Sequence, residues 1–73
     1  MRGVRRMKLT LAIMATGKTQ RRVAAETEGV LTEDRLSEIV CGWIDPRADE
    51  MAALARVLHQ PVEALFEELT AAP

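Results

Sequence analysis

The chain has 73 residues and a formal net charge of -1, but this sum hides a strong asymmetry. Residues 1–22 contain seven of the ten Lys and Arg residues and no Asp or Glu, whereas residues 23–73 contain all 11 acidic residues. A basic start suggests a polyanionic partner, although a pI of about 5.8 is low for a whole domain built to bind nucleic acid.

The composition is typical of one small helical domain in a reducing compartment. A domain of this length buries only about 60% of its unfolded surface and therefore benefits from a partner. A hydrophobic content of 48% is too high for a disordered tail. The single cysteine, Cys41, cannot form an intramolecular disulfide, which favours the cytoplasm. The apolar runs are too short for a membrane span, and the basic start lacks the apolar segment of a signal peptide.

The residue inventory offers little for catalysis or metal binding. Ser37 is the only serine and His59 the only histidine, so no nucleophile and base stand out as a pair. Structural zinc needs about four ligands, whereas Cys41 and His59 supply two without the spacing of a zinc motif. The four glycines are scattered and form no phosphate-binding loop. We therefore expect no enzyme activity, metal, cofactor or small-molecule ligand.

Glycine and threonine residues divide the chain into five predicted helices. Gly17, Gly29 and Gly42 each follow a helix-compatible stretch, where a residue of positive φ commonly ends a helix. Thr19 and Thr32 then stand where N-caps are expected. No stretch alternates convincingly between apolar and polar residues, so we predict no strand. The predicted helices cover residues 8–16, 20–28, 33 onward, 48–58 and 62–69.

Apolar residues recur at helical spacing in these segments and predict the core. The first predicted helix contains Leu9, Leu11, Ala12, Ile13 and Ala15, and the second directs Val23 and Ala24 inward. The stripes of the last three predicted helices are Leu36, Ile39, Val40 and Trp43; Met51, Leu54, Ala55 and Leu58; and Val62, Leu65, Phe66 and Leu69.

Residues 20–43 have the features of a helix-turn-helix. Two closely crossing helices need small residues, which Ala24 and Ala25 provide, and the turn needs a residue that tolerates positive φ, which Gly29 provides. Val30 is expected to fill the core beside the turn. The second helix would then bury one face and offer the other to the major groove.

On these residues the chain resembles the Cro/C1-type helix-turn-helix family of five-helix, lambda-repressor-like DNA-binding domains. The resemblance covers about residues 8–67, and here the turn carries two extra residues. These extra residues either lengthen the second helix and widen the turn, with Leu31 joining the core, or rotate the third helix. The resemblance rests on Thr19-Gln20-x-x-Val23-Ala24, Gly29-Val30, Thr32-x-x-x-Leu36-Ser37-x-Ile39-x-x-Gly42, Pro46, the helix 48–58 and Val62-Glu63-Ala64-Leu65-Phe66.

The resemblance implies an all-α domain over residues 8–69, with a flexible basic arm at 1–7 and a tail at 70–73. Family members read DNA through the first residue of the second helix and the outer face of the third. Transferred to this chain, the base contacts are Gln20, Glu33, Asp34, Ser37 and Glu38, with Cys41 on the same face and Arg35 on its flank, within reach of guanine. The expected phosphate contacts are Lys18, Thr19, Arg21, Arg22, Thr32 and Arg47, and the arm offers Arg2, Arg5 and Arg6.

The predicted function is sequence-specific binding of double-stranded DNA by a cytoplasmic, nucleoid-associated transcriptional regulator. A homodimer on a two-fold operator is expected, with Leu65, Phe66, Leu69 or Trp43 as contacts; Trp43 alternatively belongs to the core. Glu33 and Asp34 have a second interpretation, because acids in a first turn stabilise the helix dipole. The alternative function is a protein-interaction module that keeps the fold but has lost or weakened DNA binding, which the acidic outer face and the low pI favour.

Overall fold

The computed structural model describes residues 4–70, and in this range the protein is helical and without strands, which confirms the all-α prediction. The first four helices lie close to the predicted ranges. The helices are α1 (Met7–Thr16), α2 (Gln20–Glu26), α3 (Glu33–Val40), α4 (Ala48–Leu58), α5 (Val62–Leu65) and α6 (Glu67–Thr70).

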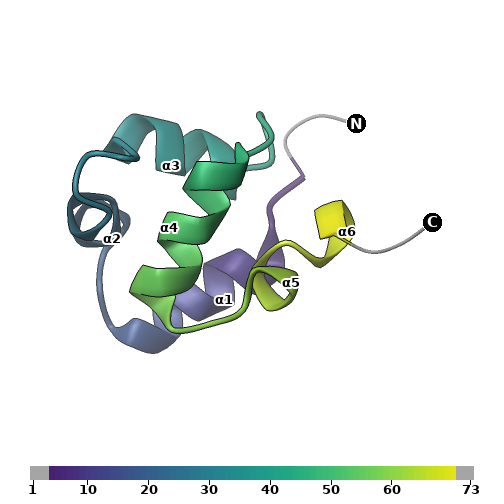
Figure 1. Ribbon diagram of the computed structural model, residues 1–73, viewed down its shortest axis with the longest axis horizontal. Coiled ribbons are helices and arrows are strands. Elements are labelled where there is room, and N and C mark those ends of the chain that lie inside the picture. The colour runs from purple at the N-terminus through teal and green to yellow at the C-terminus, as the bar shows by residue number, and fades with distance from the viewer. Residues whose placement is uncertain (1–3, 71–73) are drawn as a thin grey trace.

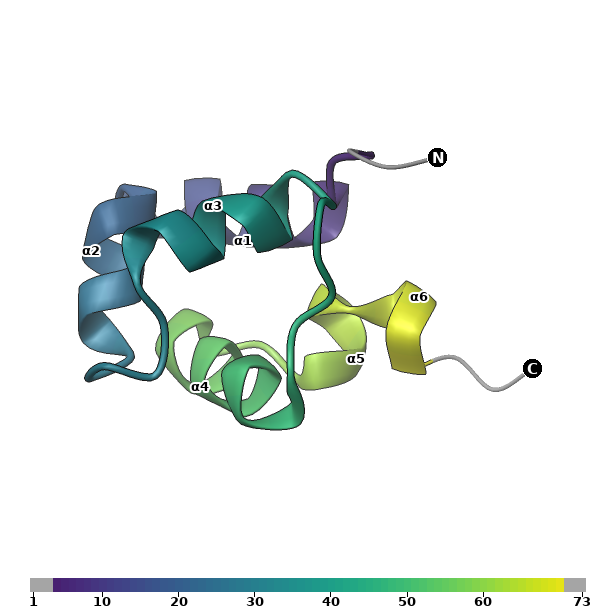
Figure 2. The same cartoon turned by 90° about the horizontal axis from the view of Figure 1, so that it is seen from above.

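The helices enclose one apolar core. Figure 2 shows α1 and α3 on one side of the molecule and α4 and α5 on the other, with α2 at one end (Figure 1). α2 packs against both α3 and α4, while α1 packs against α3, α4 and α5. Every one of the first five helices therefore contributes to the core, whose most deeply buried apolar side chains are Leu9, Val23, Leu36, Ile39, Val40, Leu54, Leu65 and Phe66.

Both predicted threonine caps are confirmed. The Thr19 hydroxyl accepts a hydrogen bond from the Arg22 amide at 3.1 Å, and the Thr32 hydroxyl accepts one from the Arg35 amide at 3.2 Å. Each bond satisfies an amide that has no partner within its own helix. The caps set the starts of α2 and α3, and hence the residues that each helix presents to solvent.

The turn between α2 and α3 differs from the prediction at two positions. α2 ends at Glu26 rather than near residue 28, because the buried Thr27 hydroxyl donates to the Ala24 carbonyl at 2.6 Å and accepts from the Leu31 amide at 3.1 Å. Leu31 is consequently 3% exposed and Val30 36% exposed. The prediction that Val30 fills the core was therefore wrong; the extra turn residue, Leu31, does so.

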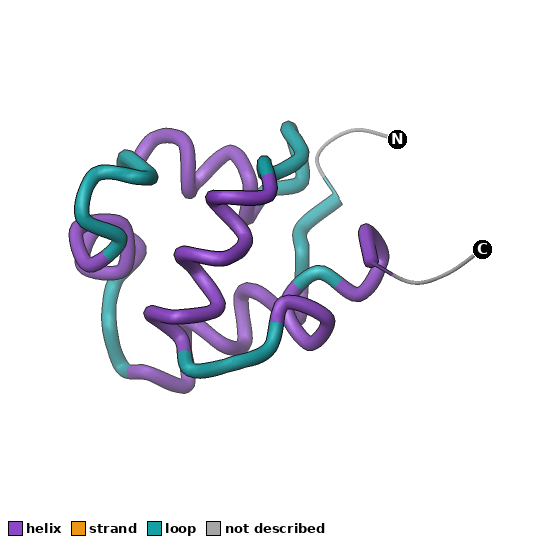
Figure 3. Tube along the Cα trace, in the orientation of Figure 1, coloured by secondary structure: helices purple, strands orange, loops and turns teal. Residues whose placement is uncertain are grey.

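The end of α3 turns Trp43 outward. Gly42 has a φ of 76° and donates to the Ile39 carbonyl, while the Trp43 amide donates to the Glu38 carbonyl, a pair of bonds that closes a helix C-terminus. The helical stripe therefore stops at Val40, and the Trp43 side chain is 64% exposed. Placing Trp43 in the core was wrong, because a residue beyond the left-handed glycine no longer follows the helical period. Figure 3 shows the loop that follows α3.

Arg6 belongs to the folded domain and not to a free arm. Its backbone amide donates to the Val40 carbonyl at 2.9 Å, and its side chain, only 9% exposed, donates to the Ile39 and Ile44 carbonyls and to Asp45. A cation at the C-terminus of α3 also complements the helix dipole. The predicted arm, residues 1–7, therefore includes residues that belong to the folded domain. Arg2 lies outside the described residues.

The predicted fifth helix is two short helices. Phe66 has φ -129° and ψ 48°, which breaks the helical backbone between α5 and α6. The Phe66 side chain is completely buried, and the Leu65 side chain is 1% exposed. The two residues face the core and are not available as the dimer contacts that the sequence suggested.

Candidate nucleic-acid interface

The outer face of α3 is polar, acidic and open to solvent. Glu33, Asp34 and Glu38 are exposed, and Ser37 is partly exposed, while Leu36, Ile39 and Val40 on the opposite face are buried. This separation follows from the helical period of the sequence. The structure therefore gathers on one face four of the six residues that were predicted to contact bases.

Arg35 is turned away from this face by a buried carboxylate. The Glu50 side chain, in the first turn of α4, is inaccessible to solvent and accepts two hydrogen bonds from the Arg35 guanidinium, at 2.5 and 3.0 Å. Its Oε1 also accepts from the Arg47 amide at 2.7 Å. The bonds from Arg35 lower the pKa of Glu50, against the opposing effect of burial, and the Arg47 amide lowers it further. Arg35 thus joins α3 to α4 and is not directed at a base.

Glu26 holds two of the predicted phosphate contacts. The Lys18 ammonium lies 2.8 Å from its Oε1, and the Arg22 Nε lies 2.8 Å from its Oε2. These two hydrogen bonds, the one from Lys18 first, keep the pKa of Glu26 below its ordinary value of 4.5. The carboxylate is consequently ionised at neutral pH and offsets part of the positive charge at the start of α2.

Arg21 and Gln20 remain available at the start of α2. Arg21 is exposed and forms no ion pair with any residue of the described part of the chain, and Gln20 is partly exposed. Arg47, also predicted to contact phosphate, is exposed but contacts Asp49 and Glu50 at 3.8 and 3.4 Å. Of the predicted phosphate-binding cations in the folded domain, Arg21 is therefore the least compensated.

A shallow hollow continues the outer face of α3 toward its C-terminus. Ser37, Glu38, Cys41 and Trp43 line it, and Cys41 is a partly exposed free thiol. The exposed Trp43 ring gives this end of the face an apolar edge. The hollow thus places a flat aromatic surface beside the carboxylate of Glu38.

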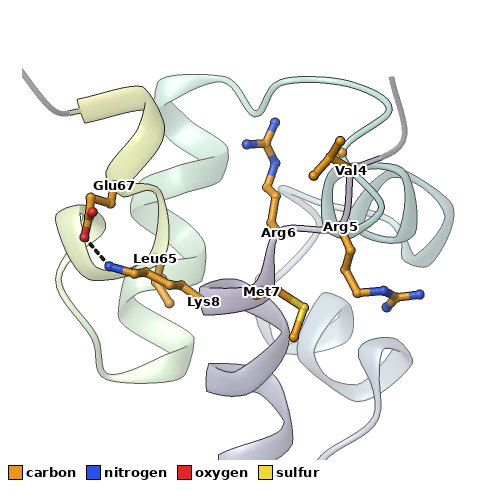
Figure 4. Close-up of a pocket in the computed structure, with 8 residues that line it drawn as sticks. Val4, Arg5, Arg6, Met7, Lys8, Leu65 and Glu67 are labelled. Carbon is orange, nitrogen blue, oxygen red and sulfur yellow. Dashed lines mark hydrogen bonds and ion pairs between the residues drawn. The ribbon is translucent and has the colours of Figure 1, made fainter. Parts of the chain in front are cut away.

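A second hollow, of about 450 Å³, lies where the N-terminal segment meets the C-terminal helices. Figure 4 shows the Lys8 side chain reaching from the start of α1 to Glu67 of α6, while the Arg5 side chain points away. Val4 and Leu65 contribute apolar surface to the same hollow. Lys8 and Glu67 are thus paired across the hollow, and Arg6 is paired with Asp45 outside it.

Sequence reasoning missed three polar residues on which this geometry depends: Glu26, Thr27 and Glu50. A carboxylate three residues after an N-cap position, as Glu50 is after Arg47, is a recognisable capping signal. Glu26 stands four residues after Arg22, which is also a readable ion-pair spacing. The burial of Thr27 carries no such local signal, because it arises from packing between α2 and the turn.

Comparison with protein-family models gives no match, and neither curated proteins nor solved structures yield a similar chain. Within residues 4–70, no three side chains of the metal-binding types are clustered to hold an ion. No helix in that range has the length and apolar character to span a bilayer. The functional interpretation therefore depends on the residues and their arrangement, and the resemblance to Cro/C1-type domains stays a prediction.

Proposed function

We propose that the protein is a sequence-specific DNA-binding regulator that presents the outer face of α3 to the major groove. The observation that carries this proposal is the position of α3, a capped amphipathic helix whose polar face is unobstructed and which packs directly against α2. Gln20 and Arg21 stand at the N-terminus of α2, a common place for contacts to the DNA backbone and to an adjacent base.

The charges of the interface imply weak non-specific attraction to DNA. Lys18 and Arg22 share the Glu26 carboxylate, and the outer face of α3 carries three further acids. Since phosphate contacts made by cations supply most non-specific affinity, few free cations mean a shallow dependence on salt. Specificity then depends on contacts to bases. The Gln20 amide is suited to adenine, and a carboxylate of the outer face can accept a hydrogen bond from the cytosine amino group.

A selection from a random duplex library, followed by titration of the recovered sites at two or more salt concentrations, tests this proposal. We expect one recovered motif and a salt slope of a few units at most. Gln20→Ala should relax the preference at one position of the motif, whereas Arg21→Ala should weaken all sequences alike and lower the salt slope by about one. Absence of binding at low salt by the full chain would contradict the proposal.

The second candidate is a protein-interaction module. The exposed Trp43 beside Glu38, and the three carboxylates of the outer face, favour a cationic partner at the position where DNA is otherwise proposed. The two candidates differ under charge reversal on this face: Glu38→Lys should strengthen binding to random-sequence duplex DNA and weaken binding to a cationic partner.

A further inference from the structure

Exposed apolar residues gather near the start of the chain. Four of the seven large apolar side chains that are exposed in the described range lie within residues 4–14, and each is more than half exposed. The core buries Leu9 and Ile13 of α1, which lie on the opposite side of the helix from the exposed residues of α1. We call the exposed group the α1 surface; it consists of Val4, Met7, Leu11 and Met14.

The α1 surface is continuous over about two turns of helix. With 3.6 residues per turn, Met7, Leu11 and Met14 lie within about 60° of one another around α1. Val4 and Met7 line the same hollow, so Val4 extends the surface beyond the start of the helix. Contiguous exposed apolar surfaces mark sites of contact with another molecule or with a membrane.

The charge beside the α1 surface is positive. Arg5 is exposed and forms no ion pair with any residue of the described part of the chain. In Figure 4 the Arg5 and Met7 side chains leave the chain on the same side, opposite to Lys8. Residues 1–22 contain no acid. The carboxylates that contact this segment are each paired with a cation of it, Asp45 with Arg6 and Glu67 with Lys8. An anionic partner is therefore favoured.

We propose that the α1 surface docks on an anionic lipid bilayer, with Met7, Leu11 and Met14 among the upper acyl chains and Arg5 among the headgroup phosphates. Area decides between a bilayer and a protein partner. Four partly exposed side chains supply less apolar area than a stable protein interface needs. A bilayer needs no matched surface, because each inserted side chain adds to the affinity and each nearby cation adds attraction to the negative headgroups.

The two contributions are expected to act together. A small apolar contact by itself gives only marginal, reversible attachment to a membrane, and stable attachment needs a second signal such as basic residues. The α1 surface supplies the apolar contact, and Arg5 with the other cations of residues 1–22 supplies the attraction. Binding should therefore require both the apolar residues and anionic lipid.

The docking is tested by co-sedimentation of the full chain with vesicles of phosphatidylcholine alone and of phosphatidylcholine mixed equally with phosphatidylglycerol. We expect at least about tenfold tighter binding to the mixed vesicles, weakening as salt is added. Leu11→Glu and Met14→Glu should each weaken this binding at least about tenfold. Val30→Glu makes the same charge change at an exposed apolar residue outside the α1 surface and should leave binding nearly unchanged.

The cation is tested with the same vesicles. Arg5→Gln should weaken binding about fivefold, the effect of one basic residue near an anionic membrane. Arg56→Gln removes the same charge from an exposed position on α4 and is the matched control, for which we expect little change. Thermal unfolding of each variant checks that the domain remains folded.

A fluorescent label reports insertion directly. With Cys41→Ser as background, a solvent-sensitive fluorophore attached at Leu11→Cys should shift to shorter wavelength on the mixed vesicles, because its surroundings lose water. The same fluorophore attached at Val30→Cys should not shift.

Three results would overturn the proposal. The first is absence of binding to the mixed vesicles at low salt. The second is equal loss of binding in Leu11→Glu and Val30→Glu, which would show that charge attraction alone holds the protein. The third is self-association that Leu11→Glu abolishes, without binding to vesicles, which would assign the α1 surface to a second copy. DNA takes no part in these measurements, so the docking and the proposed function stand or fall separately.

Discussion

The Arg35 guanidinium holds the buried Glu50 carboxylate through two hydrogen bonds, of 2.5 Å from Nε to Oε2 and of 3.0 Å from Nη2 to Oε1. This pair connects the helix whose outer face is proposed to read DNA to the first turn of α4. Glu50 also closes the capping interaction of α4 through the Arg47 amide. One carboxylate thereby sets both the start of α4 and the side chain orientation on the flank of α3.

We expect Glu50→Gln to destabilise the protein by about 2 kcal/mol at neutral pH, because the Arg35 guanidinium loses its charged partner. The folded-state pKa of Glu50 lies below its ordinary value of 4.5, so the stability that it contributes is present above about pH 4.5 and is lost as the pH falls through the folded pKa. Urea unfolding at several pH values measures both effects. The loss of stability on acidification should be smaller in the variant, and an equal loss in both proteins would contradict the role of Glu50.

Gly42 and Gly17 allow a matched test of how the N-terminal segment is packed. Both have positive φ, but a Cβ on Gly42 would lie 1.9 Å from the Val4 carbonyl oxygen, whereas one on Gly17 meets nothing within 4 Å. Gly17→Ala should cost about 1 kcal/mol, the penalty of the left-handed backbone alone, and Gly42→Ala about 2–3 kcal/mol. Thermal unfolding of both variants measures the difference. Equal costs would mean that the close contact between Val4 and Gly42 contributes nothing to stability.

Thr27 tests the geometry of the turn between α2 and α3. Thr27→Val keeps the volume of the side chain but removes the acceptor of the buried Leu31 amide, so we expect a cost of about 1–3 kcal/mol. Thr10→Val is the control, because the Thr10 hydroxyl only donates to the Arg6 carbonyl, which also accepts from the Thr10 amide. Denaturant unfolding should show a smaller effect for the control; the reverse order would argue against the hydroxyl as the element that ends α2.

Glu26 should limit the affinity for DNA. Glu26→Gln removes the carboxylate that holds Lys18 and Arg22, so we expect binding about three- to tenfold tighter and a steeper salt dependence. Glu63→Gln removes the same charge from an exposed position on α5 and is the control for net charge. Fluorescence anisotropy with a labelled duplex compares the two. Equal gains would show that net charge, and not the release of two cations, controls affinity.

Much of the fold follows from local features that can be read along the chain. The two threonine caps, the left-handed glycines that end α1 and α3, and the apolar period of α3 and α4 were predicted and are confirmed, since each depends on residues within about one turn of one another. Gly29 also has a positive φ, but α2 ends before it and Glu28 is the first left-handed residue after that helix. The outer face of α3 was predicted for the same reason. Local pattern did not predict the partners of the charged side chains, because those lie on other elements.

The all-α class, the positions of the first four helices and the residues of α3 that face away from the core all follow from local sequence patterns. Which of the charged side chains are unpaired depends on the packing of the helices. Arg35 is hydrogen-bonded to Glu50, fifteen residues away, and Arg6 is hydrogen-bonded to the Ile39 carbonyl at the C-terminus of α3, so neither guanidinium is unpaired. The physical reason is that burial is shared among distant segments: whether Trp43, Leu65 or Leu11 reaches solvent depends on how the helices pack, and not on the apolar character of the residue.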